Sequence, residues 1–406
     1  MRRNGSITTM STRTRHRGSP PDFVRPPTRR CGSVRSLLTS TTSVGRVPDC
    51  SIRPRPSRGF SAPSVASTIA TPDDASMTAS TVSTSSTPPR LVMGMPRGGT
   101  TAMMRALNSD PRVSAYGESL FWGRGWVPPG EDGKLDAAGL ERVAALLERK
   151  ALMPHGEPGG LSEDGRDIAV AAAGAVRALP SGTDPVMVFS TIGETIARHA
   201  GREIWVEKTP HHLQHLGRIF DAMPEARVLV MVREPEAFLR SYKHQGDRKP
   251  ADVRARFHRL YHPMLASLVC RRTLQGAMLA AGRWPEAVMV VRLDEVRADP
   301  SGMMARIRRH LELPDFEDRE FEPSNSSFEG VPAASKPLEA TEIIWLRLLN
   351  GRIAEAMGLP MPKRRIAPVR FVASALALIP WVIRNWKDIG RLDERGVRGM
   401  IRRWLR

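Results

Sequence analysis

Apolar and polar positions follow one another through the middle of the chain in a pattern that predicts strands separated by helices. Strands are expected at 91–93, 113–116, 203–207, 227–232 and 287–292, the last two being continuous apolar runs typical of a buried parallel sheet. Amphipathic patterns predict helices at 100–107, 136–152, 165–178, 184–200, 211–222, 235 onward, 250–282 with a bend near Pro263, 300–311 and 339–357. This order indicates an α/β fold, a three-layer, P-loop-like parallel sheet flanked by helices.

The two ends of the chain do not share this pattern. Residues 1–88 are rich in Ser, Thr, Arg and Pro without sustained periodicity, so we expect a disordered extension that cannot bury enough apolar surface to fold. Its composition superficially matches an organellar transit peptide, and translation from Met77 would omit most of it. The folded domain is expected over 89–362 and a basic amphipathic helical tail over 363–406.

The tail begins with an apolar run at 371–383 that is interrupted by Pro380 and is too short to span a membrane. It continues with arginines and tryptophans, namely Arg384, Arg391, Arg395, Arg398, Arg402, Arg403 and Arg406, with Trp381, Trp386 and Trp404. One interpretation is a helix packed on the domain with its basic face in solvent. The other is a pair of interfacial helices that rest on anionic lipid, with the tryptophans at headgroup level.

The charge of the chain is unevenly distributed. Of its net charge of +19, a large part lies in residues 1–72, which hold thirteen arginines and two aspartates, so the remainder suits an anionic substrate or surface without indicating nucleic acid. Cys31, Cys50 and Cys270 form no CxxC pair or disulfide framework, in agreement with a reducing cytosol. We expect a cytoplasmic protein, with peripheral contact at the inner face of the membrane if the tail binds lipid.

The segment 90–107, RLVMGMPRGGTTAMMRAL, is the first candidate for chemistry. A strand that enters a glycine-rich turn and then a helix can hold phosphate with backbone N–H groups and the helix dipole. Gly94 and Gly99 are separated by four residues, as in a Walker loop, but Thr100 takes the place of its lysine and Thr101 the hydroxyl position. The loop therefore predicts a phosphate held without the usual lysine and magnesium, the alternative being an ordinary strand–helix turn.

Two further strand ends carry basic side chains. Lys208 closes a strand in WVEKTP, and Arg233 follows another, with Ser241 about two turns into the next helix. Ligands of open α/β sheets bind at the carboxyl ends of strands, and a guanidinium with a hydroxyl suits a second phosphate. The alternatives are a surface lysine, a solvated serine, and a salt bridge from Arg233 to Glu234 or Glu236.

The order and spacing of these motifs resemble those of the sulfotransferase family. MPRGGTT, GE about twenty residues later, EKTP, and an apolar strand ending in VREP with a serine beyond are similar to its bacterial branch and to the protein-tyrosine sulfotransferases. The segment VVRLDEVRADPSGMMARIRRHLELP resembles that family's strand, acidic dipeptide, DP turn and FLGLP-type helix end. The resemblance covers about 90–357; Gly98 replaces the usual loop serine, and the helix end reads HLELP.

This resemblance implies the sulfotransferase fold and transfer of a sulfuryl group from 3′-phosphoadenosine 5′-phosphosulfate (PAPS) to a hydroxyl acceptor. It implies that the loop binds the 5′-phosphosulfate and that Arg233 and Ser241 bind the 3′-phosphate. The implied cofactor-binding residues are thus Arg97, Gly98, Gly99, Thr100, Thr101, Arg233 and Ser241. Lys208 would neutralise the leaving phosphate and Arg97 would assist, because a loose transition state depends on positioning and charge stabilisation.

Glu118 of the GE motif is the expected base for the acceptor hydroxyl. Partial burial would raise its pKa behind the apolar side chains of Leu120, Phe121 and Trp122. A structural helix-capping role is the alternative for Glu118, and His211 or His212 is the alternative base. His211 and His215 have the i, i+4 spacing of a metal pair, but no third ligand is apparent and the reaction needs no metal.

Two other functional classes compete with this reading. A P-loop kinase or NTPase would need a Walker lysine and a strand-end aspartate for magnesium, where this sequence has Thr100 and Arg233. An inactive sulfotransferase-like binding protein finds no support, because the motif residues are present.

The acceptor would be a small molecule, a carbohydrate, a glycolipid or a peptide tyrosine. It would be selected by insertions at about 119–200 and 245–282, whose sequences do not indicate which of these it is. Nothing in the sequence indicates the oligomeric state.

Overall fold

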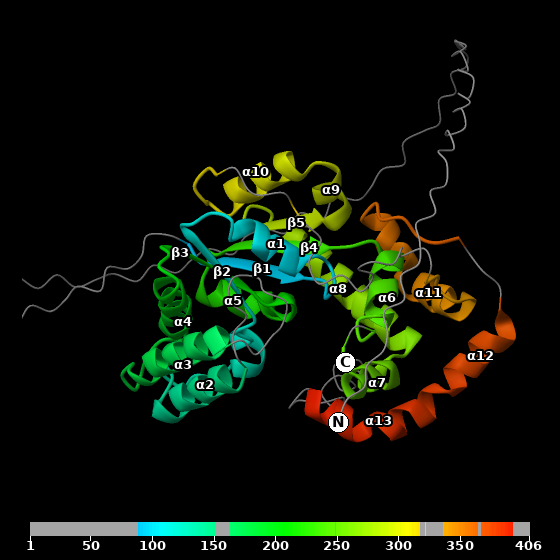
Figure 1. Cartoon of the computed structure of the whole chain (residues 1–406), viewed down its shortest axis with the longest axis horizontal. Coiled ribbons are helices and arrows are strands. Elements are labelled where there is room, and N and C mark those ends of the chain that lie inside the picture. The colour runs from blue at the N-terminus through cyan, green and yellow to red at the C-terminus, as the bar shows by residue number, and fades with distance from the viewer. Residues whose placement is uncertain are drawn as a thin grey trace, which may run out of the picture. The chain divides into compact units, whose positions relative to one another are not determined.

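The computed structural model describes residues 88–150, 163–247, 249–316, 321, 336–363 and 367–392 (Figure 1). All of them belong to the second of two units into which the chain divides, Ser80–Arg406. The prediction of disorder over 1–88 lies, up to residue 87, outside the described residues. The same holds for most of the loop between the helices predicted at 300–311 and 339–357.

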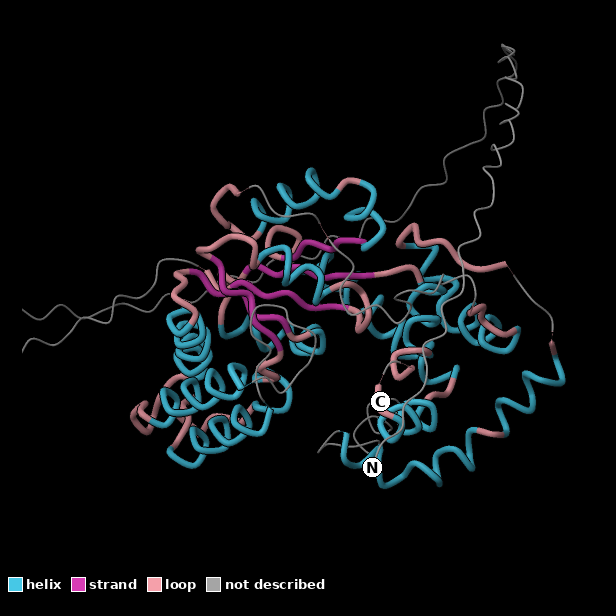
Figure 2. Tube along the Cα trace, in the orientation of Figure 1, coloured by secondary structure: helices cyan, strands magenta, loops and turns pink. Residues whose placement is uncertain are grey.

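Within the described residues, five parallel strands form one sheet in the order β2-β3-β1-β4-β5 (Figure 2). Each predicted strand is present, and their bounds are β1 Arg90–Gly94, β2 Val113–Gly117, β3 Ile204–Lys208, β4 Arg227–Val232 and β5 Val288–Arg292. Because all the strands are parallel, their carboxyl ends lie along one edge of the sheet. That edge is where an open α/β sheet binds its ligands.

Alternate strand residues pack into two separate hydrophobic cores on opposite faces of the sheet. Val92, Leu229 and Met231 belong to the core beneath α1 Thr100–Leu107, α9 Leu293–Ala298 and α10 Pro300–His310. Their neighbours Leu91 and Val230 belong to the other core. The helices that contribute to this second core are α2 Ala137–Lys150, α3 Glu163–Arg177, α4 Pro185–His199, α5 Leu216–Ala222, α6 Pro235–Lys243, α8 Pro263–Arg283 and α11 Ala340–Ala356. The three-layer prediction is confirmed (Figure 1).

The helices differ from the sequence prediction in three places. The segment predicted as one helix at 211–222 is a 3₁₀ turn, Pro210–His215 (η3), followed by α5. The helix predicted at 250–282 is two helices, α7 Ala251–Leu260 and α8, because the residue before a proline is pushed out of the helical region. Pro263 instead takes the first position of α8, where its missing N–H costs nothing. The short helix α9 was not predicted.

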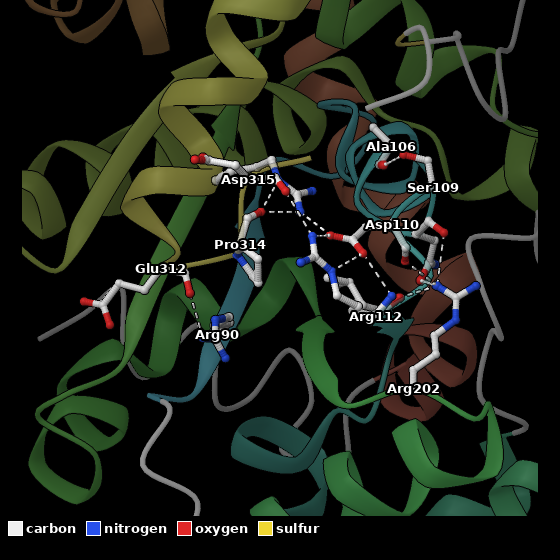
Figure 3. Close-up of polar contacts among 12 residues, drawn as sticks. Arg90, Ala106, Ser109, Asp110, Arg112, Arg202, Glu312, Pro314 and Asp315 are labelled. Atoms are coloured by element: carbon white, nitrogen blue, oxygen red, sulfur yellow. Dashed lines mark hydrogen bonds and ion pairs between the residues drawn. The ribbon is translucent and has the colours of Figure 1, made fainter. Parts of the chain in front are cut away.

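Asp110 organises the amino-terminal side of the sheet (Figure 3). Its buried carboxylate accepts bonds from Arg112 Nε at 3.0 Å and Nη2 at 2.9 Å and from Arg308 of α10. Arg308 also donates to the Pro314 carbonyl at 2.7 Å, and Arg202 donates to the Asp110 carbonyl at 3.2 Å. This network joins the turn after α1, which the sequence predicts, to the carboxyl end of α10.

Glu312 terminates α10 in the left-handed backbone region, with φ of 51°. This is one of the two positions at which HLELP departs from the FLGLP pattern, and the glycine of that pattern would adopt this conformation without strain. The Glu312 carbonyl accepts from Arg90 Nη2 at 2.9 Å, and its carboxylate lies 2.5 Å from Arg227 Nη2. Glutamate is therefore held at a glycine-type position by partners at the starts of β1 and β4.

The tail forms two helices, α12 Pro368–Leu376 and α13 Leu378–Leu392. Trp345 of α11 donates to Ser374 Oγ at 3.2 Å, and Trp381 donates to the Arg259 carbonyl at 3.1 Å. Trp381 is therefore buried against α7, and the prediction that it lies at lipid headgroup level is wrong; the side chains of Trp386 and Trp404 lie outside the described residues. Among the described helices, none is both long and apolar enough to cross a membrane.

Candidate active site

Four neighbouring strands bring the predicted site residues to the carboxyl edge of the sheet. Glu118 follows β2, Lys208 ends β3, the loop 95–99 follows β1, and Arg233 follows β4. Since the order across the sheet is β2-β3-β1-β4, the loop stands between Lys208 on one side and Arg233 on the other. The structure thus assembles residues that are far apart in the sequence; Arg97 and Arg233, for example, are 136 positions apart.

The loop after β1 opens the N-terminus of α1. Gly99 caps the helix with φ of 93°, and a Cβ there would lie 2.6 Å from Leu293 Cδ1. The first helical bond runs from Met103 N to Gly99 O at 2.9 Å, so the N–H groups of Thr100 and Thr101 precede it and have no acceptor within the helix. These N–H groups, the two hydroxyls and the positive end of the helix dipole form an anion-binding geometry.

Gly98 closes the loop. Its N–H donates to the Met95 carbonyl at 2.8 Å. A Cβ at Gly98 would lie 2.7 Å from that same carbonyl, so the loop in this conformation has no room for the serine of the family pattern.

Arg97 contacts both Arg233 and Ser241, the two residues expected to bind the second phosphate. Arg97 Nε donates to Ser241 Oγ at 3.3 Å, and Arg233 Nη1 donates to the Arg97 carbonyl at 3.1 Å. Arg97 has φ of 64°, a strained value for a residue with a side chain. Ser241 is buried, so it is not a solvated serine. Glu236, one of the two alternative partners expected for Arg233, pairs with Arg240.

The surroundings of Arg233 are strongly positive. Burial, and then the charges of Arg297 and Arg97, lower the pKa of Arg233 to about 10, with Glu234 opposing the shift. Burial also lowers the pKa of Arg97. Several positive charges lie close together here, and the buried Arg233 Nε has no hydrogen-bond partner. Both features indicate a place for an anion.

Arg297 was not among the predicted site residues. It lies on α9, the helix that the sequence did not predict, and acts on Arg233 from 64 positions away. The sequence contains it only as one basic residue in RLDEVRADP, a segment read as part of the family pattern. No local signal marks it.

Lys208 is buried and reaches Glu118. Its Nζ lies 3.0 Å from Oε1 of Glu118, and its side chain is 1% exposed, so it is not a surface lysine. It passes directly over Gly117, where a Cβ would lie 2.8 Å from Lys208 Cε. Glycine at 117 therefore leaves the room that the lysine needs to reach the edge of the sheet.

Glu118 is partly buried, as the sequence predicts, and lies beside a cation. Leu120, Phe121 and Trp122 are buried, and the two aromatic rings pack edge to face with centroids 5.0 Å apart. The Glu118 side chain is 35% exposed, and its carboxylate faces the Lys208 ammonium. The carboxylate is therefore partly open to solvent.

Glu207 forms a second carboxylate centre directly beneath the site. It is fully buried and accepts from Ser119 Oγ at 2.8 Å and from Thr209 Oγ1 at 2.5 Å, and His212 Nδ1 lies 3.1 Å from it. Burial favours the neutral carboxyl, but His212 and these hydrogen bonds outweigh it and lower the pKa of Glu207. The sequence showed this group only as a glutamate inside an otherwise apolar strand.

The three histidines predicted as base or metal ligands lie in different settings. His212 is buried against Glu207 and has no route to an acceptor. His211 is exposed at the surface. His215 lies against Gly123. The described residues contain no group of three or more His, Cys, Asp or Glu side chains able to hold a metal ion.

The sequence comparison decides the family. A model described as "Sulfotransferase family" matches residues 89–318. The chain belongs to the sulfotransferase family. No curated protein matches the chain significantly.

Solved sulfotransferase structures resemble this chain at low sequence identity. They include the sulfotransferase domain from the Synechococcus PCC 7002 olefin synthase, with 15% identity over 68% of this chain and 96% of that one and a TM-score of 0.43. The sulfotransferase domain from the curacin biosynthetic pathway has 16% identity, coverage of 68% and 99%, and a TM-score of 0.40. Sulfotransferase STF9 from Mycobacterium avium has 18% identity, coverage of 68% and 79%, and a TM-score of 0.35.

The loop departs from a Walker motif in two respects. Thr100 occupies the lysine position, and Lys208, which ends the neighbouring strand, is a lysine at the same sheet edge. The residue that follows β4 is Arg233 and not an aspartate. The described sheet edge therefore gathers arginines, backbone N–H groups and a lysine.

Proposed function

We propose that this sulfotransferase moves the sulfuryl group of PAPS to a hydroxyl acceptor, with Glu118 as the base. The observation that carries the proposal is that two anion-binding centres share one sheet edge. One is the N-terminus of α1 with Arg97 of the loop, and the other is formed by Arg233 and Ser241, both of which contact Arg97; Lys208 and Glu118 follow the strands on the other side of the loop. A nucleotide with both a 5′-phosphosulfate and a 3′-phosphate matches two separated centres of positive charge.

The donor is held by complementary charge in this proposal. Thr100 and Thr101 would give N–H and hydroxyl donors to the 5′-phosphosulfate, and Arg97 would cover it from the loop. Arg233 and Ser241 would take the 3′-phosphate, whose two charges would satisfy the buried Arg233 Nε and offset the repulsion among the arginines.

The transfer step would use the Lys208–Glu118 pair. The acceptor oxygen forms a bond to sulfur while the bond from sulfur to the bridging oxygen of the 5′-phosphate breaks, and 3′-phosphoadenosine 5′-phosphate leaves. Glu118 takes the proton of the acceptor hydroxyl, and Lys208 neutralises the charge that develops on the bridging oxygen. The two members of this ion pair would thereby have different roles, Glu118 as the base and Lys208 as the counter-ion of the leaving phosphate.

The acceptor is proposed only by class: a small molecule, a carbohydrate or a glycolipid. The segment between β2 and β3, which contains α2, α3 and α4, begins at Glu118 and would be the first part of the chain that an acceptor meets. No nucleic acid is proposed as partner.

Two measurements test the proposed function. Calorimetric titration should show that 3′-phosphoadenosine 5′-phosphate binds at least tenfold more tightly than adenosine 5′-monophosphate, since a charged hydrogen-bonded contact contributes about 1.5–3 kcal/mol. Incubation with ³⁵S-labelled PAPS and a cell extract, followed by separation of lipid, sugar and small-molecule fractions, should label one fraction.

Controls separate the competing functions. Release of phosphate from ATP in the same preparation would support a P-loop NTPase and contradict the proposal. Tight binding of the bisphosphate without transfer to any fraction would support an inactive binding protein. Equal affinity for the two nucleotides would contradict the assignment of the 3′-phosphate centre.

A further inference from the structure

The outward face of α12 and α13 carries a continuous apolar stripe. It consists of five side chains spaced three or four positions apart, each between 55% and 81% exposed: Val369, Val372, Leu376, Ile379 and Ile383. The spacing places them on one side of the two helices. Large aliphatic side chains exposed in a row usually mark a surface that meets something apolar.

The opposite face fixes the orientation of the stripe. Phe371 packs on Trp345 with ring centroids 4.6 Å apart, and Ser374 Oγ accepts from the same tryptophan. Trp381 and Asn385 donate to the Arg259 carbonyl at 3.1 Å and 3.3 Å. Turning the stripe inward would break these contacts, so its exposure follows from how the helices are docked. In Figure 1 the two helices run one after the other past α11 and α7.

The charges beside the stripe are all of one sign. Arg370 and Arg384 are exposed on the same two helices. From 356 to 387 the sequence has no aspartate or glutamate, and its charged residues are Lys363, Arg364, Arg365, Arg370, Arg384 and Lys387. An apolar strip bordered by arginines is complementary to a surface whose interior is apolar and whose boundary is anionic.

We propose that this face lies on an anionic lipid bilayer, with the five aliphatic side chains among the upper acyl chains and the arginines at the lipid phosphates. A second copy of the chain is a poorer occupant, because a symmetric contact would set the same arginines against one another without a carboxylate between 356 and 387 to pair with them. Trp381 has no part in this contact, since it faces the domain. The proposal does not depend on the reaction that the site catalyses.

Vesicle sedimentation with the full chain tests this surface. The anionic vesicles contain phosphatidylcholine with about 30% phosphatidylglycerol, and they should bind the protein strongly. Vesicles of phosphatidylcholine alone should bind it at least tenfold more weakly. The double substitution Leu376→Glu with Ile383→Glu should lower binding to the anionic vesicles by at least tenfold, because two charged groups would have to enter the apolar layer.

A matched control exists in the same fold. Leu279 of α8 and Leu348 of α11 are 68% and 64% exposed but lie outside the stripe. Leu279→Glu with Leu348→Glu should bind the vesicles like the unsubstituted protein. Arg370→Gln with Arg384→Gln should weaken binding to the anionic vesicles by about fivefold for each arginine and leave the weak binding to neutral vesicles unchanged.

Three results would overturn the proposal. The first is equal binding to neutral and anionic vesicles, and the second is equal loss in the stripe and control variants. The third is a dimer, seen by sedimentation equilibrium, that the stripe variant abolishes while lipid binding is absent; a second copy would then be the occupant. If the stripe variant unfolds at a lower temperature than the unsubstituted protein, its loss of binding is not used. The proposal then depends on the arginine variant, and unchanged binding of that variant to anionic vesicles contradicts it.

Discussion

The ammonium of Lys208 lies 3.0 Å from Oε1 of Glu118, although the two residues are 90 positions apart and follow different strands. The lysine is buried and the carboxylate is partly exposed, so the pair presents its acidic side to solvent. Lys208 ends β3, which neighbours the strand that leads into the loop, whereas Glu118 follows β2 at the edge of the sheet. In the proposed reaction the cation would thus stand nearer the donor and the base nearer the acceptor.

Glu118→Gln should lower the turnover number by about 10²–10⁴-fold, since the amide cannot take the acceptor's proton. Binding of 3′-phosphoadenosine 5′-phosphate should change by less than about twofold, because Glu118 faces Lys208 and not the arginine group. Steady-state transfer of ³⁵S and calorimetric titration measure the two effects.

His211→Ala is the matched variant for the base, because the sequence offers His211 as an alternative base and the charge of Glu118 acts on its pKa. It should retain most of the activity. A collapse of turnover in His211→Ala, with Glu118→Gln nearly unchanged, would assign the base to the histidine.

Arg233→Ala should weaken binding of 3′-phosphoadenosine 5′-phosphate by about 10–100-fold and leave binding of adenosine 5′-monophosphate nearly unchanged, since only the first carries a 3′-phosphate. The pKa of Arg233, lowered to about 10, still keeps the side chain charged at neutral pH. Affinity should therefore be level from pH 7 to about pH 9 and fall as the pH passes about 10. Equal losses for both nucleotides would place the 3′-phosphate elsewhere.

Asp110→Ala should lower the free energy of unfolding by about 3–5 kcal/mol, because it leaves the buried Arg308 guanidinium without its carboxylate. Burial favours protonation of Asp110, but the bonds from Arg112 and Arg308 outweigh it and lower the pKa of this carboxyl. Its stabilising contribution is therefore complete above about pH 4 and is lost as the pH falls below that value. Urea unfolding at pH 7 and at pH 3 measures both effects.

The exposed carboxylate Glu141, which pairs with Arg177 on the surface, provides the control. Glu141→Ala should hardly change the urea midpoint, because exposed ion pairs contribute little to stability. A similar midpoint for Asp110→Ala and Glu141→Ala would show that the Asp110 network is dispensable.

Glu312→Gly should be more stable than Glu312→Ala by about 1 kcal/mol. Both variants lose the contact to Arg227, but only alanine keeps a Cβ at a φ of 51°. Thermal unfolding of the two proteins gives the comparison directly. An alanine variant as stable as the glycine variant would show that the backbone at 312 relaxes.

Much of this molecule could be predicted from its sequence because the relevant signals are local. The strands are short apolar runs, and Lys208, Arg233 and the loop before α1 follow directly from strands, so their placement at one sheet edge is a consequence of parallel topology. Ser241 was predicted because it lies about two turns into α6, the helix that follows Arg233.

The contacts that the sequence did not reveal join segments without a fixed spacing. Arg297 reaches Arg233 through tertiary packing, and Glu207 becomes a hydrogen-bonded centre only when Ser119 and His212 close around it. The side of α13 that carries Trp381 also depends on which face docks on α7, a choice that helical periodicity leaves open. Local pattern determines the elements, whereas the partners of buried charges depend on packing.

The segment between β2 and β3 has a consequence for engineering. Glu118 stands at its first position, and Lys208 closes the strand to which it leads. A chimera that exchanges 118–208 as one block with a relative would transfer the proposed base, its cation and the intervening helices together. If the junction were placed anywhere between the two residues, the base would come from one parent protein and the cation from the other. New acceptor preference should therefore be easier to import by whole-block exchange than by piecewise grafting of α2, α3 or α4.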